Sequence, residues 1–242
     1  MKKQNYTYIG ISFIVLIFGI IFIPRIIDRI TEGTVVENDR LNIKNNEGEL
    51  AYVTFEGAKK KVPEFAFTNQ DSIVISNRDY LGKVYVVEFF FTSCPSICPI
   101  MTENLVDIQE EFKGLDNFGL ASFSIAPKQD TPTVLKQYAE KNGITNLDWN
   151  LMTGDKEKIY ELANKGFNIF AAENPNVDGG FEHSGMFALI DKNGFIRSRV
   201  DDYGNPIIYY RGVITEADGE NEEGETEQIS VLKEDIKKLL AE

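Results

Sequence analysis

VYVVEFFFTSCPSICPIMTENL, residues 84–105, is the stretch that decides the fold of this chain. Its first part, Val84–Phe91, consists of β-branched and aromatic residues with one glutamate among them, which predicts a strand buried on both faces of a central sheet. From Ile97 onward apolar residues recur at helical spacing, and Pro99 suits a first helical turn because its missing N–H is not needed there. The stretch therefore predicts a strand that turns into a helix.

Both cysteines of the chain, Cys94 and Cys98, lie at this transition from strand to helix. The unpaired amide groups and the positive dipole end of a helix N-terminus favour thiolate over thiol, and thiolate is the form that binds metals and attacks disulfides. A short structural disulfide is the alternative interpretation, but a bridge across so small a loop stabilises little. The position therefore favours a reactive pair.

Composition limits the classes of function. A chain of 242 residues with 43% hydrophobic residues can bury one substantial core. Its formal net charge of -13 leaves no broad basic surface, which argues against nucleic acid as a partner. Two cysteines and a single histidine, His183, are too few for the usual structural zinc sites. Any site for a soft metal must therefore be small.

Residues 1–30 predict a transmembrane anchor. After Lys3 no charged residue occurs until Arg25, a gap of 21 residues rich in Ile, Phe and Val, and a span needs about 20 apolar residues. A cleaved signal peptide is the alternative, but no Ala-x-Ala-like site follows the apolar run. The lysines at the start favour a cytoplasmic N-terminus, whereas Arg25 and Arg29 weaken that preference. We expect a single pass through the cytoplasmic membrane, with the globular domain on the extracytoplasmic (periplasmic) side, where disulfides persist.

Residues 31–50 are rich in Asn, Glu, Asp and Gly and show no sustained period, which is typical of a linker. The remaining residues, 51–242, predict one globular domain. It opens with three strand-like segments, residues 52–55, 65–68 and 72–76. The second and third of these form a hairpin around the turn Asn69-Gln70-Asp71.

Strands and helices alternate after the central strand and its helix. Within Asp130-Thr131-Pro132, Thr131 suits a helix cap and Pro132 the first helical position, and this role alone explains the motif. The order of elements, βαβα followed by ββα, predicts an α/β thioredoxin-like fold with a largely parallel central sheet, flanking helices and right-handed crossovers. The segments concerned are strands at 119–126 and 147–152, helices at 132–141 and 155–165, a hairpin of 186–191 and 195–200, and a closing amphipathic helix at 229–240.

Residues 216–227 carry seven acidic residues and no basic one. A solvated surface loop is the simplest interpretation of such a run, and we prefer it to a metal-collecting or partner-binding segment.

The residues FFFTSCPSICP, 89–99, closely resemble the metal-binding signature of the Sco/SenC family. The resemblance extends from about Phe65 to Arg197 and includes Asp130-Thr131-Pro132 and Glu182-His183-Ser184. Members of that family are membrane-tethered, thioredoxin-like proteins that handle copper during cytochrome oxidase assembly. The resemblance implies a metallochaperone and not an enzyme, with Cu(I) or Cu(II) bound by the two cysteines of CxxxC and one histidine. Its implied partner is the copper-bearing subunit of cytochrome c oxidase or another copper or thiol protein.

The copper ligands implied by the resemblance are Cys94, Cys98 and His183. Two soft thiolates and one imidazole suit Cu(I), and an added water or carbonyl would suit Cu(II). A satisfied polar residue in a loop is the alternative for the histidine. The thioethers of Met101 and Met186 could also bind copper, although core packing is the simpler role for both.

Three positions depart from the family pattern. Aspartate is common where this chain has Ser96, Ala126 and Glu182. The first two changes remove negative charge near the site, and none of the three removes a ligand.

Glu88 leads to a second hypothesis. A carboxylate inside an apolar strand is unfavourable and its pKa should rise, unless it reaches the strand's end or a basic partner. Thioredoxins have an acidic residue at this offset that helps to move protons, so the alternative function is a thiol-disulfide oxidoreductase using Cys94, Cys98 and Glu88. The CxxxC spacing, and Gly185 where thioredoxins usually have proline, argue against it. A peroxiredoxin fits less well, because its threonine lies three residues before the cysteine and Thr92 lies two before it.

Overall fold

The computed structural model describes residues 11–13, 15–20, 22–24, 50–55, 57–200 and 206–242. The chain divides into two units, residues 1–46 and residues 47–242. In the first unit, the described residues are helical and mostly exposed. Among the described residues, no helix is both long enough and apolar enough to cross a membrane. The other residues of the predicted anchor (1–30) lie outside the described part of the chain. So does the predicted linker (31–50), except for Leu50.

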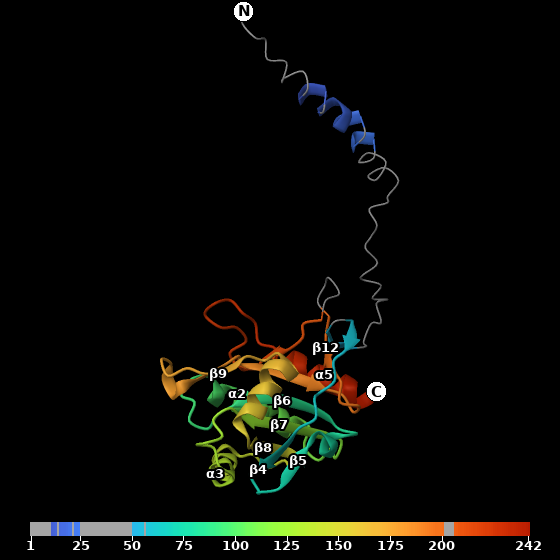
Figure 1. The fold of residues 1–242 in the computed structure, drawn as a ribbon. Helices are drawn as coiled ribbons and strands as arrows, with labels where there is room; N and C mark the ends of the chain where they lie inside the picture. Colours follow the sequence, from blue (N-terminus) through green and yellow to red (C-terminus); the bar gives the residue numbers. More distant parts are fainter. Residues whose placement is uncertain (1–10, 14, 21, 25–49, 56, 201–205) are drawn as a thin grey trace, which may run out of the picture. The chain divides into compact units, whose positions relative to one another are not determined.

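The second unit is organised around one mixed sheet (Figure 1). Its strand order is β1-β12-β11-β6-β7-β8-β4-β5, and β13 also pairs with β11. Two small hairpins, β2-β3 and β9-β10, lie outside it. The bounds in the sheet are Ala51–Tyr52 (β1), Ile196–Ser198 (β12), Met186–Ile190 (β11), Val84–Phe90 (β6), Phe118–Ser124 (β7), Trp149–Thr153 (β8), Ala66–Asn69 (β4), Val74–Ser76 (β5) and Tyr210–Arg211 (β13). Those of the hairpins are Thr54–Phe55 (β2), Ala58–Lys59 (β3), Ala171–Glu173 (β9) and Phe181–His183 (β10).

The centre of the sheet is parallel and its flanks are antiparallel. β6 pairs in parallel with β7, and β7 with β8, and every residue of these three strands is buried. β11 runs antiparallel to β6, and β4 runs antiparallel to β8. The prediction of a largely parallel sheet is therefore wrong outside these three strands, because only they are joined by helical crossovers. The predicted hairpins β4-β5 and β11-β12 are confirmed.

Helices cover both faces of the sheet. Successive residues of a strand point to opposite faces, and Phe89 packs against Phe167, whereas Phe90 packs against Tyr138. The first contact belongs to a π-helix and the second to α3, so these two elements lie on opposite faces. The helices are Ile97–Glu111 (α2), Pro132–Asn142 (α3), Lys156–Glu161 (α4), the π-helix Leu162–Phe167 (η3), Ile229–Ala241 (α5), and the short 3-10 helices Asn77–Tyr80 (η2) and Asp178–Gly180 (η4).

Local sequence explains where several helices begin. Thr131 caps α3 by accepting the N–H of Val134 at 3.4 Å, and Pro132 is the first helical residue, as predicted. Asp155 caps α4 in the same way through Lys158. By contrast, the hairpin β9-β10 and the π-helix were not predicted, since segments of three to six residues show no usable period.

The acidic segment 216–227 makes several contacts with the rest of the domain. Lys233 forms ion pairs with Glu216, and Arg211 with Glu225. Glu227 accepts the N–H groups that open α5. The segment is a surface loop with most of its acids exposed, as predicted, and these three acids also bind the rest of the domain and the start of the closing helix.

Arg197, the charged residue of β12, is buried, with 3% of its surface exposed, and its side chain forms several hydrogen bonds. Its guanidinium donates to Asp191 at 3.1 Å, to Glu242 at 2.8 and 2.9 Å, and to the carbonyl oxygen of Leu50 at 2.7 Å. The ring of Tyr52 lies 4.2 Å from its central carbon. The residue thus joins β12 to β1 and to the residue that follows α5.

Replacing this arginine should destabilise the domain strongly. Arg197→Met leaves the buried carboxylate of Asp191 without its counter-charge, which lowers the free energy of unfolding by about 3–5 kcal/mol, measured by urea unfolding. Lys113→Met is the control, because it breaks only an exposed pair with Glu110 and should cost less than about 1 kcal/mol. Equal losses in the two variants would show that the arginine pairs contribute no more than a surface pair.

Candidate metal centre

Strand direction brings three distant segments to one edge of the sheet. β6 and β7 are parallel, so they end at the same edge, and β11 begins there because it runs antiparallel to β6. Cys94 and Cys98 follow β6, and His183 lies just before β11. The fold therefore gathers all three at the carboxyl edge of the parallel strands.

The three side chains converge. The sulfurs of Cys94 and Cys98 and one ring nitrogen of His183 all lie within 4.8 Å of one another. Nε2 of His183 lies 3.2 Å from Sγ of Cys98. Atoms held about 2.0–2.3 Å from one ion are at most about 4.6 Å apart, so little contraction is needed to share one. Both thiols are free and buried, and the histidine is half-buried.

The N-terminus of α2 points its amide groups at Cys94. Ser96, at the N-cap, makes no capping bond through its side chain, and the N–H of Cys98 donates instead to the sulfur of Cys94 at 3.4 Å. Ser96 Oγ also lies 3.7 Å from that sulfur. A hydrogen bond from the Cys98 thiol lowers the pKa of Cys94, with the amide of Cys98 adding to the effect. The same thiol contact, together with burial, raises the pKa of Cys98, so Cys94 ionises first.

His183 is the last residue of strand β10, so the alternative of a polar residue in a loop is wrong. The register places it opposite Ala171 of β9, and the N–H of Ser184 donates to the carbonyl oxygen of Phe170 at 3.1 Å. Its Nδ1 is buried and has no hydrogen-bond partner among the described residues. The imidazole therefore depends on the hairpin and on packing for its position.

Phe91 supplies much of that packing. Its ring meets Phe181 at 5.1 Å and His183 at 5.9 Å between centroids. Gly179, at φ +83°, lies so close that a Cβ there would approach the Phe91 ring to 2.9 Å and Pro95 to 3.2 Å. The hairpin thus rests directly on the residues that flank Cys94, and it needs glycine at this point.

Gly185 is explained by a second close approach. A Cβ at this position would lie 2.1 Å from Val213 and 3.3 Å from Ile97. The segment after β13 crosses the start of β11 here, and no larger residue fits. Sequence reasoning treated this glycine only as a departure from thioredoxins.

Glu88 is buried in β6, as its position in the apolar run predicted, with 2% of its surface exposed. Its Oε1 accepts the hydroxyl of Ser122 at 2.6 Å, and Trp149 donates to the same hydroxyl at 2.9 Å. Its Oε2 has no partner in the described part of the chain. Burial raises the pKa of Glu88 to about 7. The alternative, that it reaches a basic partner, is wrong for the described residues.

The remaining candidates lie as follows. Met101 is fully buried in the core, as the simpler interpretation predicted, and Met186 is half-buried. Glu182 is exposed beside the histidine. The structure brings together the three predicted ligands, and that they bind a metal stays a prediction.

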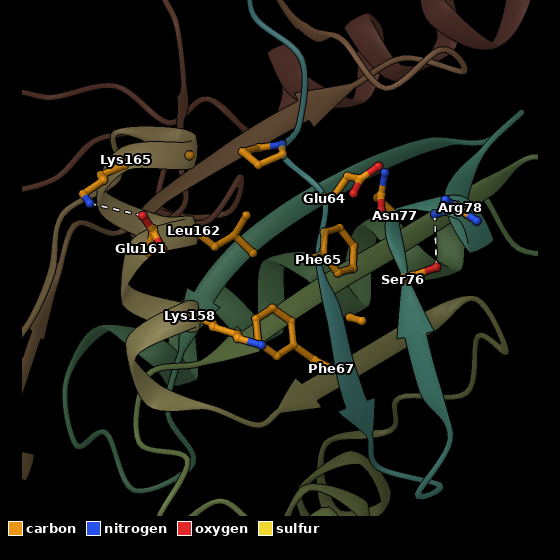
Figure 2. A pocket seen from close by; sticks show the side chains of 13 residues that line it. Glu64, Phe65, Phe67, Ser76, Asn77, Arg78, Lys158, Glu161, Leu162 and Lys165 are labelled. Atoms are coloured by element: carbon orange, nitrogen blue, oxygen red, sulfur yellow. Dashed lines mark hydrogen bonds and ion pairs between the residues drawn. The ribbon is translucent and has the colours of Figure 1, made fainter.

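An open pocket lies elsewhere on the domain (Figure 2). It measures about 750 Å³, and Phe65, Phe67 and Leu162 are among the apolar residues that line it, with Arg78 and Lys158 among the basic ones. None of the three clustered side chains lines it. It is therefore not part of the candidate metal centre.

Comparisons with known proteins agree with this fold. Residues 54–217 match the SCO1/SenC family. A SCO1 protein homolog of Bacillus subtilis is 32% identical over 136 residues, which cover 55% of this chain and 70% of that protein. A SCO2-like protein of Rickettsia prowazekii is 31% identical over 137 residues, 54% of this chain and 64% of that protein.

Solved structures show the same likeness. The crystal structure of a SCO1/SenC family lipoprotein from Bacillus anthracis is 30% identical, with a TM-score of 0.62, and covers 75% of this chain and 95% of that one. The structure of BsSco is 27% identical, with a TM-score of 0.59, and covers 74% and 93%.

The fold and the cluster define a thioredoxin-like α/β domain with two thiols and an imidazole at one edge of its sheet. The chain belongs to the SCO1/SenC family. The predicted α/β thioredoxin-like fold of the domain and the predicted family are thereby confirmed, and the N-terminal transmembrane helix stays a prediction.

Removing the buried carboxyl should change how stability depends on pH. The pKa of Glu88 is raised from 4.5 to about 7 in the folded state. Its protonation therefore stabilises the fold fully below about pH 4.5, and that contribution is lost as the pH rises through 7. Glu88→Gln should remove this loss, so the variant should gain about 3 kcal/mol on the wild type between pH 4.5 and pH 8, measured by urea unfolding at each pH.

Glu103→Gln removes an exposed charge from α2 and controls for the change in net charge. A Glu88→Gln variant whose difference from wild type did not vary with pH would contradict the shifted pKa.

Proposed function

We propose that the protein is a copper metallochaperone for cytochrome c oxidase assembly, with Cys94, Cys98 and His183 as the copper ligands. The observation that carries the proposal is the convergence of the three donor atoms within 4.8 Å. Sulfur and imidazole nitrogen are the ligands that copper prefers over the harder divalent cations. In this role copper is cargo, and the protein binds it and passes it on.

Relatives support copper as the cargo and an oxidase as its destination. A protein of Stutzerimonas stutzeri whose name assigns it copper binding is 25% identical over 147 residues, 59% of this chain and 70% of that protein. BsSco is described as a member of the Sco family of cytochrome c oxidase assembly proteins. We infer a non-enzymatic role, and as acceptor the copper-bearing oxidase subunit or another copper or thiol protein.

We further propose that residues 1–30 anchor the protein in the cytoplasmic membrane, with the domain on the extracytoplasmic side. The apolar run between Lys3 and Arg25 supports the anchor. Such an anchor suits the proposed function, because it would hold the thiol pair outside the cytoplasm, where it is proposed to meet an oxidase subunit.

Copper titration tests the ligand set. The reduced, metal-free full chain should bind one equivalent of Cu(I), measured anaerobically by competition with a chromophoric chelator. Cys94→Ala and Cys98→Ala should lose the site, because each removes one of only two thiolates. His183→Ala should weaken Cu(I) binding and abolish the wild-type Cu(II) absorption, because a two-sulfur set no longer matches the original ligands.

Met101→Leu is the matched control, since it removes a thioether from the same helix at nearly constant volume, and it should retain one equivalent. Unchanged Cu(I) affinity and an unchanged Cu(II) spectrum in His183→Ala would remove the imidazole from the site.

A thiol-disulfide oxidoreductase is the second candidate function, and the unequal thiols favour it. Cys94 has a lowered pKa and is the attacking sulfur, whereas Cys98 has a raised one and holds its proton. The charge of Glu88 is one of the causes that raise the pKa of Cys98. A carboxyl with a pKa of about 7 is suited to exchange that proton near neutral pH.

This second function predicts disulfide exchange without metal. The reduced, copper-free protein should reduce a disulfide-bonded oxidase peptide to its dithiol, and Cys94 and Cys98 should form a disulfide in the same reaction. Glu88→Gln should slow the reaction at least tenfold near pH 7 while leaving Cu(I) stoichiometry unchanged. The rate is followed by quenching with acid and separating the oxidised and reduced peptide. Equal rates for the wild type and for Cys94→Ala would exclude the reaction.

A further inference from the structure

Asp130 is a fully buried carboxylate, with 0% of its surface exposed. It lies between β7 and α3, at the sheet edge that carries the candidate metal centre. Its Oδ1 accepts the hydroxyl of Thr92 at 2.5 Å. Its Oδ2 accepts the backbone N–H of Thr92 at 3.1 Å and the hydroxyl of Ser124 at 2.5 Å. Both carboxylate oxygens are therefore used.

These bonds join the ends of two neighbouring strands. Ser124 is the last residue of β7, and Thr92 lies two residues after the end of β6 and two before Cys94. A weaker contact runs beside them, from the hydroxyl of Ser93 to Oε1 of Gln129 at 3.3 Å. The turn that carries Cys94 is thus fastened to the loop that precedes α3.

Capping of α3 does not account for this arrangement. The cap is Thr131, whose side chain accepts the N–H of Val134, and Asp130 makes no bond to the helix amides. Three donors converge on its two oxygens, and only a carboxylate accepts at both ends, because an asparagine presents an NH₂ group on one side. The chemistry of the site therefore selects aspartate for a contact with the cysteine turn.

We propose that Asp130 is a positioning residue for the copper site and acts through Thr92. The inference rests on the proposed copper function and extends it to residues that do not touch the metal. By holding the main chain and the hydroxyl of Thr92, the carboxylate fixes the turn from which the sulfur of Cys94 reaches Cys98 and His183. We call the hydrogen bonds between Asp130 and Thr92 the clamp. Without the clamp the turn is freer to move, and copper binding must then remove that freedom. The copper affinity therefore falls, although the ligands remain in place.

Three variants test the clamp in the full-length protein. Thr92→Val removes the hydroxyl at nearly constant shape, Thr92→Ser restores it, and Asp130→Asn removes one acceptor. Asp155→Asn is the matched control, because it makes the same substitution at the cap of α4. Each variant is compared with the wild type for Cu(I) affinity, for the thiolate-to-Cu(II) absorption band and for its thermal unfolding midpoint.

Thr92→Val and Asp130→Asn should each retain one equivalent of copper, bind it at least fivefold more weakly and show a displaced Cu(II) band. Thr92→Ser and Asp155→Asn should match the wild type in both respects. A lower unfolding midpoint with unchanged affinity and spectrum would overturn the proposal, because it would show a contribution to stability alone. Should Asp130→Asn fail to fold, the comparison of Thr92→Val with Thr92→Ser decides.

A readout without copper separates this inference from the proposed function. The equilibrium between the dithiol and the Cys94–Cys98 disulfide is measured in a buffer of glutathione and glutathione disulfide. Thr92→Val should lower the equilibrium constant for forming the disulfide at least threefold relative to Thr92→Ser. A looser turn lowers the effective concentration of one thiol at the other. Absence of copper binding in the wild type would defeat the copper function, and the disulfide equilibrium would still test the clamp. Identical equilibria in the two variants would defeat the clamp.

Discussion

The candidate site depends on the antiparallel pairing of β11 with β6 at the centre of the sheet. This pairing sets Ala188 opposite Val87, and it carries the segment that precedes β11 to the edge where β6 ends. A slip of one residue would turn each side chain of β11 to the opposite face. Because both faces of these strands are buried, such a slip would force the side chains of β11 into packing spaces shaped for other residues. The same hydrophobic burial that stabilises the sheet therefore keeps the imidazole 3.2 Å from the sulfur of Cys98.

The cysteine side and the histidine side of the cluster are held by different forces. Directed hydrogen bonds hold the cysteine turn, through Asp130 and through the amide of Cys98. The histidine has no bond to Nδ1 among the described residues, and its hairpin rests on Phe91 through aromatic contacts and a close approach at Gly179. Metal-bound histidines usually donate their second nitrogen to a fixed partner. A cluster held by hydrogen bonds on one side and by packing on the other suits the proposed transfer of copper to an acceptor.

Elements with strong local patterns could be predicted, and contacts between distant segments could not. The strand at Val84–Phe91 and the following helix are marked by continuous apolar residues and by helical spacing, and both are present. The hairpin β9-β10 has three residues in each strand, so no period identifies it as the element that carries His183. The parallel fraction of the sheet was overestimated, because hairpin strands can add to either flank without a crossover.

The same limit applies within the site. The burial of Glu88 could be predicted from its apolar neighbours in the strand. Its hydrogen bond with Ser122 could not, because that contact depends on the register of β6 with β7. Asp130 had a sufficient local explanation as part of a helix start, so its bonds to the cysteine turn were not foreseen. The ligands themselves came from a family resemblance, since no spacing rule relates His183 to a cysteine 85 residues away.

Both candidate functions require the thiol of Cys98 to lose its proton. Its burial, its contact with Cys94 and the charge of Glu88 all raise its pKa. A bound cation offsets these effects by attracting the thiolate, so a metal competes directly with the proton at this sulfur. Without a metal, the proton leaves only with a base, and Glu88 is the acid in β6 whose pKa of about 7 allows it to cycle near neutral pH. Under the two proposals, copper binding and thiol chemistry are therefore exclusive states of one sulfur, and the occupancy of the metal would decide which of them the domain performs.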